Sequence, residues 1–177
     1  STDIEFEHEG SLYTLVDTAG VRRRGRIRKG VEKYSFLRSL RSAGQADVCA
    51  LMIDGKEGVT TQDQHVANYI LEHHSGLLLV VNKLDLMEKG EAERDQFLHQ
   101  LRYQFDFVPW APVVFVSAKT GKNVDRILEL AKKIKEHRSQ RIATSILNQW
   151  LQKVILKQLP SGAGRKIPRL YYMTQVG

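Results

Sequence analysis

Features that define several protein classes are scarce or missing in this chain of 177 residues. Its single cysteine, Cys49, lies in an apolar stretch and is interpreted as a small core residue of a protein from a reducing compartment. No apolar run approaches the roughly 18–20 residues that cross a bilayer, and no charged segment followed by an apolar one forms a signal sequence. The sequence therefore predicts a cytoplasmic protein that does not enter a membrane.

Acidic residues are missing from the last part of the chain. From Arg138 to Gly177 there are seven basic residues and no Asp or Glu, whereas the other 20 basic residues are balanced by 20 acidic ones. The net charge of +7 is thus concentrated at one end. This predicts a domain boundary near Arg138 and an anionic partner for the second part, nucleic acid being the commonest. The alternative is an exposed helix whose charges are solvated.

Apolar strands alternate with helical stretches along the first part of the chain. A hairpin is predicted at Ile4–His8 and Leu12–Asp17, with its turn at Glu9 and Gly10. The helices that follow are expected at Gly30–Ala43, Thr61–His74, Glu91–Phe105 and Val124–Glu136, and the strands at Asp47–Asp54, Gly76–Asn82 and Val113–Ser117. The strand at Asp47–Asp54 is a continuous apolar run, which is typical of a parallel strand buried on both faces. The order predicts an α/β fold, a mostly parallel sheet with helices on both faces.

The pattern changes in the second part. An amphipathic helix is expected at Thr144–Leu159 and a strand at Leu170–Val176, with a loop rich in small residues between them. One helix and one strand cannot close a core, so this second domain is expected to be partial. We predict two domains, residues 1–138 and 139–177.

The most informative motif is Asn82-Lys83-Leu84-Asp85, which follows the apolar run Leu77–Val81. An aspartate two residues after the lysine can accept hydrogen bonds from both N1–H and the 2-amino group of guanine. Adenine lacks this pair of donors, and a site built for hydrogen-bond donors rejects an analogue without them by large factors. The motif lies at the carboxyl end of a strand, where open α/β sheets bind ligands. The alternative for Lys83 is a solvated surface charge.

Two further motifs lie at strand ends. Asp17-Thr18-Ala19-Gly20 follows the hairpin, so Asp17 could hold Mg²⁺ through water and the Gly20 amide could approach a terminal phosphate. Ser117-Ala118-Lys119 follows the last strand, so the Ala118 amide could donate to guanine O6 and Lys119 could pack along the base. Each motif alone is common; their order and spacing make coincidence the weaker interpretation. Asp54-Gly55 shows no ligand chemistry and is interpreted as a turn.

The order of these motifs resembles that of the translation-factor-like GTPases, and more narrowly the EngA/Der family. The segments that carry this resemblance are Asp17–Ile27, Val31–Ser35, Gly58–Asp63, Thr144–Asn148 and Tyr171–Gly177. The resemblance implies a P-loop-NTPase-type domain that binds GTP or GDP with Mg²⁺, followed by the start of an α+β KH-like domain. It also implies a role in assembly of the large ribosomal subunit, with ribosomal RNA as the partner of the basic second part.

The chain departs from this family in one respect, because no G-x-x-x-x-G-K-[ST] loop is present to cradle phosphates. We expect a fragment that lacks the strand and loop of the phosphate site, with an exposed sheet edge through which it self-associates or loses stability. Weak or undetectable affinity for GTP is expected from the chain alone. The alternative function, from a different class, is an RNA- or ribosome-binding module without nucleotide hydrolysis.

Val21 follows the D-x-x-G motif where many GTPases carry a glutamine that orients water. Valine forms no hydrogen bond, so no catalytic residue is assigned, and the resemblance implies a potassium ion near the phosphates of the intact protein. Contacts to RNA or another partner are predicted for Arg22, Arg23, Arg24, Arg26, Arg28 and Lys29, and for Arg165, Lys166 and Arg169 of the second part. A solvated loop is the alternative for the first of these clusters.

Overall fold

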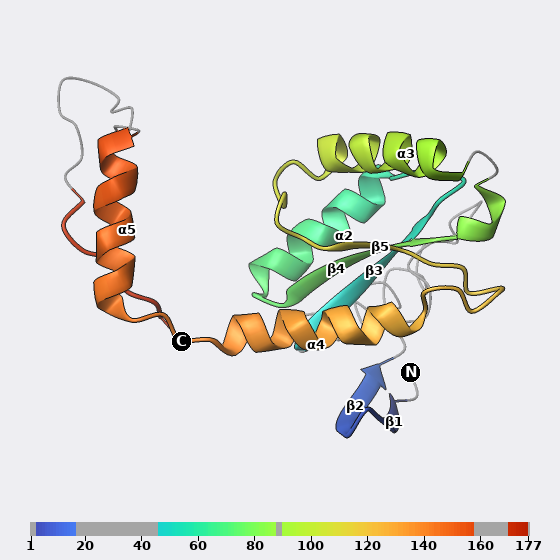
Figure 1. Ribbon diagram of the computed structural model, residues 1–177, viewed down its shortest axis with the longest axis horizontal. Coiled ribbons are helices and arrows are strands. Elements are labelled where there is room, and N and C mark those ends of the chain that lie inside the picture. Colours follow the sequence, from blue (N-terminus) through green and yellow to red (C-terminus); the bar gives the residue numbers. More distant parts are fainter. Residues whose placement is uncertain (1–2, 17–45, 88–89, 158–169, 177) are drawn as a thin grey trace, which may run out of the picture. The chain divides into compact units, whose positions relative to one another are not determined.

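The computed structural model describes residues 3–16, 46–87, 90–157 and 170–176 (Figure 1). The chain divides into two compact units, residues 1–138 and 139–177. The helix predicted at 30–43 lies outside the described residues. None of the described helices combines the length and the apolar character that crossing a membrane requires.

The first described element is the predicted hairpin. Strand β1 (Asp3–His8) pairs antiparallel with β2 (Ser11–Val16). Glu9 and Gly10 have φ angles of 49° and 70°, and two successive positive φ values are typical of the tight turn that matches the twist of paired strands. Phe6 and Tyr13 are cross-strand partners whose rings stack with centroids 5.5 Å apart.

A second sheet contains three parallel strands in the order β3-β4-β5. They are β3 (Val48–Asp54), β4 (Gly76–Asn82) and β5 (Val113–Phe115). The side chains of Leu77–Val81 in the central strand are all fully buried, and each apolar side chain buried in this way contributes about 1.5–3 kcal/mol as an upper estimate. The mostly parallel sheet predicted from the sequence is confirmed.

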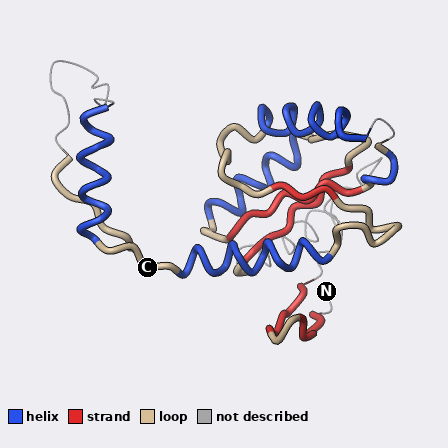
Figure 2. The backbone as a smooth tube through the Cα atoms, viewed as in Figure 1, coloured by secondary structure: helices blue, strands red, loops and turns tan. Residues whose placement is uncertain are grey.

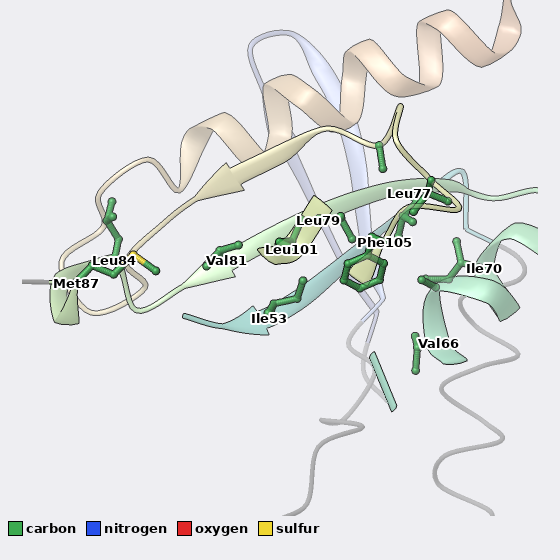
Figure 3. Close-up of a cluster of buried hydrophobic side chains, with 13 residues drawn as sticks. Ile53, Val66, Ile70, Leu77, Leu79, Val81, Leu84, Met87, Leu101 and Phe105 are labelled. Atoms are coloured by element: carbon green, nitrogen blue, oxygen red, sulfur yellow. The ribbon is translucent and has the colours of Figure 1, made fainter. Parts of the chain in front are cut away.

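Helices cover both faces of this sheet (Figure 2). On one face, α2 (Thr61–Glu72) and α3 (Gly90–Gln104) pack on the cluster shown in Figure 3, which contains Ile53, Val66, Ile70, Leu77, Leu79, Val81, Leu84, Met87, Leu101 and Phe105. On the other face, α4 (Asp125–Ser139) packs on Leu78, Val80, Val114 and Val116.

Helix α2 begins where the sequence predicts because of a reciprocal cap. The Thr60 hydroxyl accepts a hydrogen bond from the Asp63 amide at 3.3 Å, and the Asp63 carboxylate accepts one from the Thr60 amide at 2.8 Å. Two backbone donors that a helix start leaves without partners are thereby satisfied.

Strand β3 differs from the prediction of burial on both faces. Ile53 is 1% exposed, but Ala50 and Met52 on the opposite face are exposed, Met52 by 45%. The reason is the position of α4, whose apolar residues cover β4 and β5 but reach only Val48 of β3. Within the described residues β3 is an edge strand, so α4 leaves its carboxyl half uncovered on that face.

The second unit contains α5 (Thr144–Lys157). The strand predicted at Leu170–Val176 does not form, and the described residues of this segment are irregular. Two side-chain amides hold this segment instead of a partner strand, one binding its backbone at Met173 and one reaching from Gln175 to the residues before α5. Asn148 donates to the Met173 carbonyl at 3.1 Å and accepts from the Met173 amide at 2.9 Å, while Gln175 accepts from the Ile142 amide at 2.8 Å and donates to the Gln140 carbonyl at 3.1 Å.

Candidate functional site

The N-K-x-D motif forms a tight turn directly after the central strand. β4 ends at Asn82, Lys83 has a left-handed backbone with φ 70°, and a 3₁₀ turn covers Leu84–Leu86. A left-handed conformation costs a residue with a side chain roughly 1–2 kcal/mol. The surrounding contacts offset this cost, because the Asn82 carboxamide oxygen accepts from the Lys83 amide at 2.8 Å and the Leu84 amide donates to the Val116 carbonyl at 2.9 Å.

Two side chains of the hydrophobic core anchor the same turn. Leu84 and Met87 are both 9% exposed and belong to the buried cluster drawn in Figure 3, where they lie past the carboxyl ends of the strands. Asp85, between them in sequence, is exposed. The apolar residues of the turn therefore anchor it and leave its carboxylate at the surface.

The S-A-K motif lies in the loop after β5. Ser117 is 1% exposed; its amide donates to the Lys122 carbonyl at 3.0 Å and its hydroxyl accepts from the Thr120 amide at 3.2 Å. Ala118 and Lys119 are exposed. The loop is therefore held by a buried serine and presents the next two residues outward.

Two hydrogen bonds join the motifs. The Ser117 hydroxyl donates to Asp85 Oδ1 at 2.5 Å, and the Ala118 amide donates to Asn82 Oδ1 at 3.0 Å. The structure thus brings together the side chains of Asn82, Asp85 and Ser117 and the backbone of Ala118, as their positions at adjacent strand ends predict.

The electrostatic environment keeps Asp85 ionised. The hydroxyl of Ser117 is the main cause that holds the pKa of the Asp85 carboxyl below its ordinary value. Desolvation is the next largest effect and opposes it, while a backbone hydrogen bond and the charges of Lys119 and Lys83 lower the pKa by smaller amounts. Asp85 is consequently a pure hydrogen-bond acceptor at neutral pH.

Lys83 has a partner that the sequence did not reveal. Its ammonium lies 2.7 Å from Oδ2 of Asp54, whose side chain is 13% exposed. The predicted turn at Asp54 is present, since Oδ1 of that residue accepts from the Lys56 amide at 2.9 Å. The pairing follows from the adjacency of β3 and β4 in the sheet, where Asp54 is the register partner of Asn82, and chain order alone does not give that adjacency.

Several predicted site residues lie outside the described ranges. These are Asp17, Gly20 and Val21, the basic residues Arg22, Arg23, Arg24, Arg26, Arg28 and Lys29, and Arg165, Lys166 and Arg169. In the part of the chain that the structure describes, no group of three or more His, Cys, Asp or Glu side chains is placed to hold a metal ion. Asp17 remains the predicted Mg²⁺ residue.

The described loops supply chemistry suited to the edge of a planar base. An ionised carboxylate accepts, a backbone amide donates and an ammonium lies beside them, all at the carboxyl edge of a parallel sheet with helices on both faces. The fold and site define the class of α/β nucleotide-binding domains. Within that class the chain belongs to the family of the elongation factor Tu GTP binding domain, whose model matches residues 1–137.

The curated relatives that this chain resembles carry the name GTPase Der. GTPase Der of Chloroflexus aggregans is 44% identical over 174 residues, which cover 98% of this chain and 39% of that protein. GTPase Der of Caldanaerobacter subterraneus subsp. tengcongensis is 42% identical over 176 residues, or 99% of this chain and 40% of that protein. The chain spans about two fifths of the length of these relatives. The predicted resemblance to the EngA/Der family is confirmed.

Solved structures agree with the fold. Aquifex aeolicus Era bound to GDP and AlF₄⁻ superposes with a TM-score of 0.59 at 21% identity, covering 73% of this chain and 42% of that one. Era in complex with MgGDPNP and a segment of 16S ribosomal RNA gives a TM-score of 0.59 at 22% identity, with coverages of 73% and 43%. At these identities the likeness shows the fold alone. The match to the elongation factor Tu GTP binding domain, together with this fold, confirms the predicted P-loop-NTPase-type class.

Proposed function

We propose that the described loops are the base-recognising part of a guanine-nucleotide site, and that the chain works in a cytoplasmic GTP-hydrolysing factor for assembly of the large ribosomal subunit. The observation that carries this proposal is the bond from Ser117 to Asp85, which fixes an ionised acceptor beside the Ala118 amide. The resemblance to GTPase Der supports the assembly role.

Recognition of guanine follows from the donors and acceptors of the site. Asp85 would accept from N1–H and the 2-amino group, and the Ala118 amide would donate to O6. In the structure that amide donates to Asn82 Oδ1, so base binding requires the amide to share or exchange this bond. Adenine offers an acceptor at N1 and no 2-amino group, which leaves Asp85 without donors and disfavours its binding.

Contacts to the phosphates would come from residues other than those that contact the base. The sequence contains no G-x-x-x-x-G-K-[ST] loop, so the described residues offer base contacts without the backbone cradle that binds phosphate. We propose that Asp17 holds Mg²⁺ through water and that Gly20 lies near the terminal phosphate, with a potassium ion assisting hydrolysis in the intact protein. Val21 leaves the D-x-x-G segment without a side chain to orient water.

The proposed partner of the second unit is ribosomal RNA. Arg141 and Lys153 are exposed there, and so are the aromatic side chains of Trp150, Tyr171 and Tyr172. Cations neutralise phosphates and exposed aromatic rings stack on unpaired bases, which is the usual chemistry of single-stranded RNA binding. We propose that this unit belongs to a KH-like domain.

The test compares binding of a guanine and an adenine nucleotide to the unmodified chain. GDP and ADP are titrated to millimolar concentration while the backbone amides are followed by NMR. GDP should shift the amides of Asn82, Asp85 and Ala118, and ADP should leave them unchanged. Millimolar nucleotide reveals even weak binding, so equal shifts with both nucleotides, or none with either, would contradict the proposal. RNA binding without any response to GDP would favour the alternative, an RNA-binding module without nucleotide chemistry.

A further inference from the structure

We propose that Asp54 is a positioning residue for guanine-nucleotide recognition, which acts by holding the ammonium of Lys83 at the base-reading loops. The proposal rests on the proposed function and adds to it a residue from a strand that carries none of the three recognised motifs. The juxtaposition that supports it is the meeting of two adjacent parallel strands at their carboxyl ends.

The register of the sheet places the two residues together. Asp54 ends β3 opposite Asn82, which ends β4, and Lys83 is the next residue. The ammonium of Lys83 lies 2.7 Å from Asp54 Oδ2, and the two side chains are 41% and 13% exposed. An ion pair with one nearly buried partner is screened less than one at the open surface.

The two oxygens of Asp54 have separate roles. Oδ1 accepts hydrogen bonds from the amides of Lys56 at 2.9 Å and Glu57 at 3.3 Å, which fixes the turn and the orientation of the carboxylate. Oδ2 contacts Lys83. The lysine, with its four-carbon flexible stem, is therefore held by a carboxylate that the backbone has already oriented.

The same turn also contacts the backbone of the N-K-x-D motif. The Gly55 amide donates to the Asn82 carbonyl at 2.9 Å. A Cβ at position 55 would lie 2.7 Å from that carbonyl oxygen and 2.8 Å from Met87 Cε. The end of β3 thus supports the motif twice, through its backbone at Asn82 and through its charged side chain at Lys83.

The half-buried carboxylate of Asp54, by holding Lys83, has an electrostatic consequence at Asp85. The charge of Lys83 contributes to holding the pKa of Asp85 down, and Asp54 determines where that charge is. Preorganised groups recognise a ligand better than groups that must be ordered on binding. Removing Asp54 is expected to weaken guanine-nucleotide binding through Lys83, with the fold retained.

The test uses Asp54→Asn in the full chain. Asparagine keeps an oxygen for the Lys56 and Glu57 amides and removes the charge that faces Lys83. The matched control is Asp47→Asn, which removes the ion pair of Asp47 with Lys135, also 2.7 Å long, beside the opposite end of the same strand, where the side chains are 65% and 64% exposed. Binding is measured from the initial slope of the GDP-dependent NMR shifts.

Asp54→Asn should weaken GDP binding about tenfold, the size expected for a hydrogen bond to a charged group, while Asp47→Asn stays within about twofold of the unmodified chain. In a Lys83→Met background the effect of Asp54→Asn should disappear, because Asp54 acts through the lysine. Equal affinity for the two Asp variants would overturn the proposal. So would an undiminished effect in the Lys83→Met background, since Asp54 would then act only through its turn.

A second measurement separates this proposal from the proposed function. Without nucleotide, amide hydrogen exchange at Lys83 and Asp85 should quicken in Asp54→Asn and remain unchanged in Asp47→Asn. If the unmodified chain does not bind GDP but the two variants still differ in amide exchange, guanine nucleotide is excluded as the ligand and the positioning contact stands. A chain that binds GDP while the exchange of both variants is unchanged would overturn the positioning role alone.

Discussion

Asp85 and Ser117 are 32 residues apart in sequence and share a hydrogen bond of 2.5 Å between the ends of two neighbouring strands. The serine hydroxyl also accepts from the Thr120 amide, so its single proton is directed at Asp85. A buried residue of one loop therefore sets both the orientation and the ionisation of a carboxylate in the other. The predictions below follow from this bond and from the contacts around it.

The first prediction concerns base specificity. Asp85→Asn replaces two acceptor oxygens by one acceptor and one donor. Xanthine carries a carbonyl where guanine carries the 2-amino group, so the variant should lose GDP binding and favour xanthosine diphosphate by at least tenfold. Competition between the two nucleotides measures the change. Asp95→Asn, on the exposed surface of α3, is the control and should keep the preference for GDP.

The second prediction concerns pH. Because the folded-state pKa of Asp85 is lowered, its ionised form stabilises the fold at pH above the ordinary value of 3.8, and this contribution is lost as the pH falls through the folded pKa. Ser117→Ala removes the main cause, so the pKa should rise toward the ordinary value. NMR titration of the side-chain carboxyl carbon reports it. Ser145→Ala in the other unit should change nothing, and an unshifted titration in Ser117→Ala would contradict the assigned cause.

The third prediction compares two glycines of one turn. Gly55→Ala places a methyl group against a backbone carbonyl that cannot retreat without losing the Gly55–Asn82 hydrogen bond, and should cost about 1–3 kcal/mol of unfolding free energy. Gly58 has open space but a φ of 79°, so Gly58→Ala should cost roughly 1–2 kcal/mol from backbone strain. Denaturant unfolding measures both.

The two variants should differ in which backbone amides they perturb. Only Gly55→Ala should also shift the amide resonances of Asn82 and Lys83, since only position 55 contacts that motif. Similar shifts in both variants would mean that the turn moves as a unit.

The fourth prediction concerns Cys49. Burial raises the pKa of this thiol from 9.0 to about 11, against a smaller opposing effect of Arg138. A raised thiol pKa lowers the thiolate fraction at neutral pH roughly a hundredfold, and thiolate is the reactive form. Alkylation by iodoacetamide at pH 7.5 should be slower in the folded chain than in guanidinium by at least that factor. Equal rates would contradict the burial of the thiol.

The fifth prediction concerns association. Met52 is 45% exposed on an edge strand of the described sheet, and exposed apolar edges favour pairing with another copy. Sedimentation velocity should show self-association that increases with concentration and decreases in Met52→Lys. Tyr103→Lys, at an exposed position of α3, is the control. A monomer at all concentrations would refute the prediction.

A site residue could be predicted from the sequence when it lies in a recognisable motif, and could not when its role depends on which strands are neighbours. Asn82, Asp85 and Ser117 are recognisable because each lies in a motif at the end of an apolar strand, and parallel strands bring such ends together. Asp54 lies at a strand end without a motif, and its role depends on which strands are neighbours. The pairing of β3 with β4 supplies that information, and chain order alone does not.

The prediction of the fold was correct to a similar degree, and its errors have related causes. The apolar run at Leu77–Val81 correctly predicts a strand buried on both faces. The comparable run in β3 correctly predicts a strand but not its burial, since the cover of an edge strand depends on where α4 lies. At Leu170–Val176 the strand pattern is overridden by tertiary contacts. Asn148 binds both backbone groups of Met173, which a neighbouring strand would otherwise bind, and Gln175 binds the backbone of Gln140 and Ile142.

The hydrogen bonds between the Asn148 side chain and the Met173 backbone make the second unit sensitive to a slow covalent change, the deamidation of Asn148. The Asn148 nitrogen donates to the carbonyls of Thr144 and Met173 while its oxygen accepts from the Met173 amide. Conversion to aspartate would remove both donors and set a negative charge against two carbonyl oxygens. An ageing sample would then release residues 170–176 from α5 without any change in the loops around Asp85 and Ser117 of the first unit.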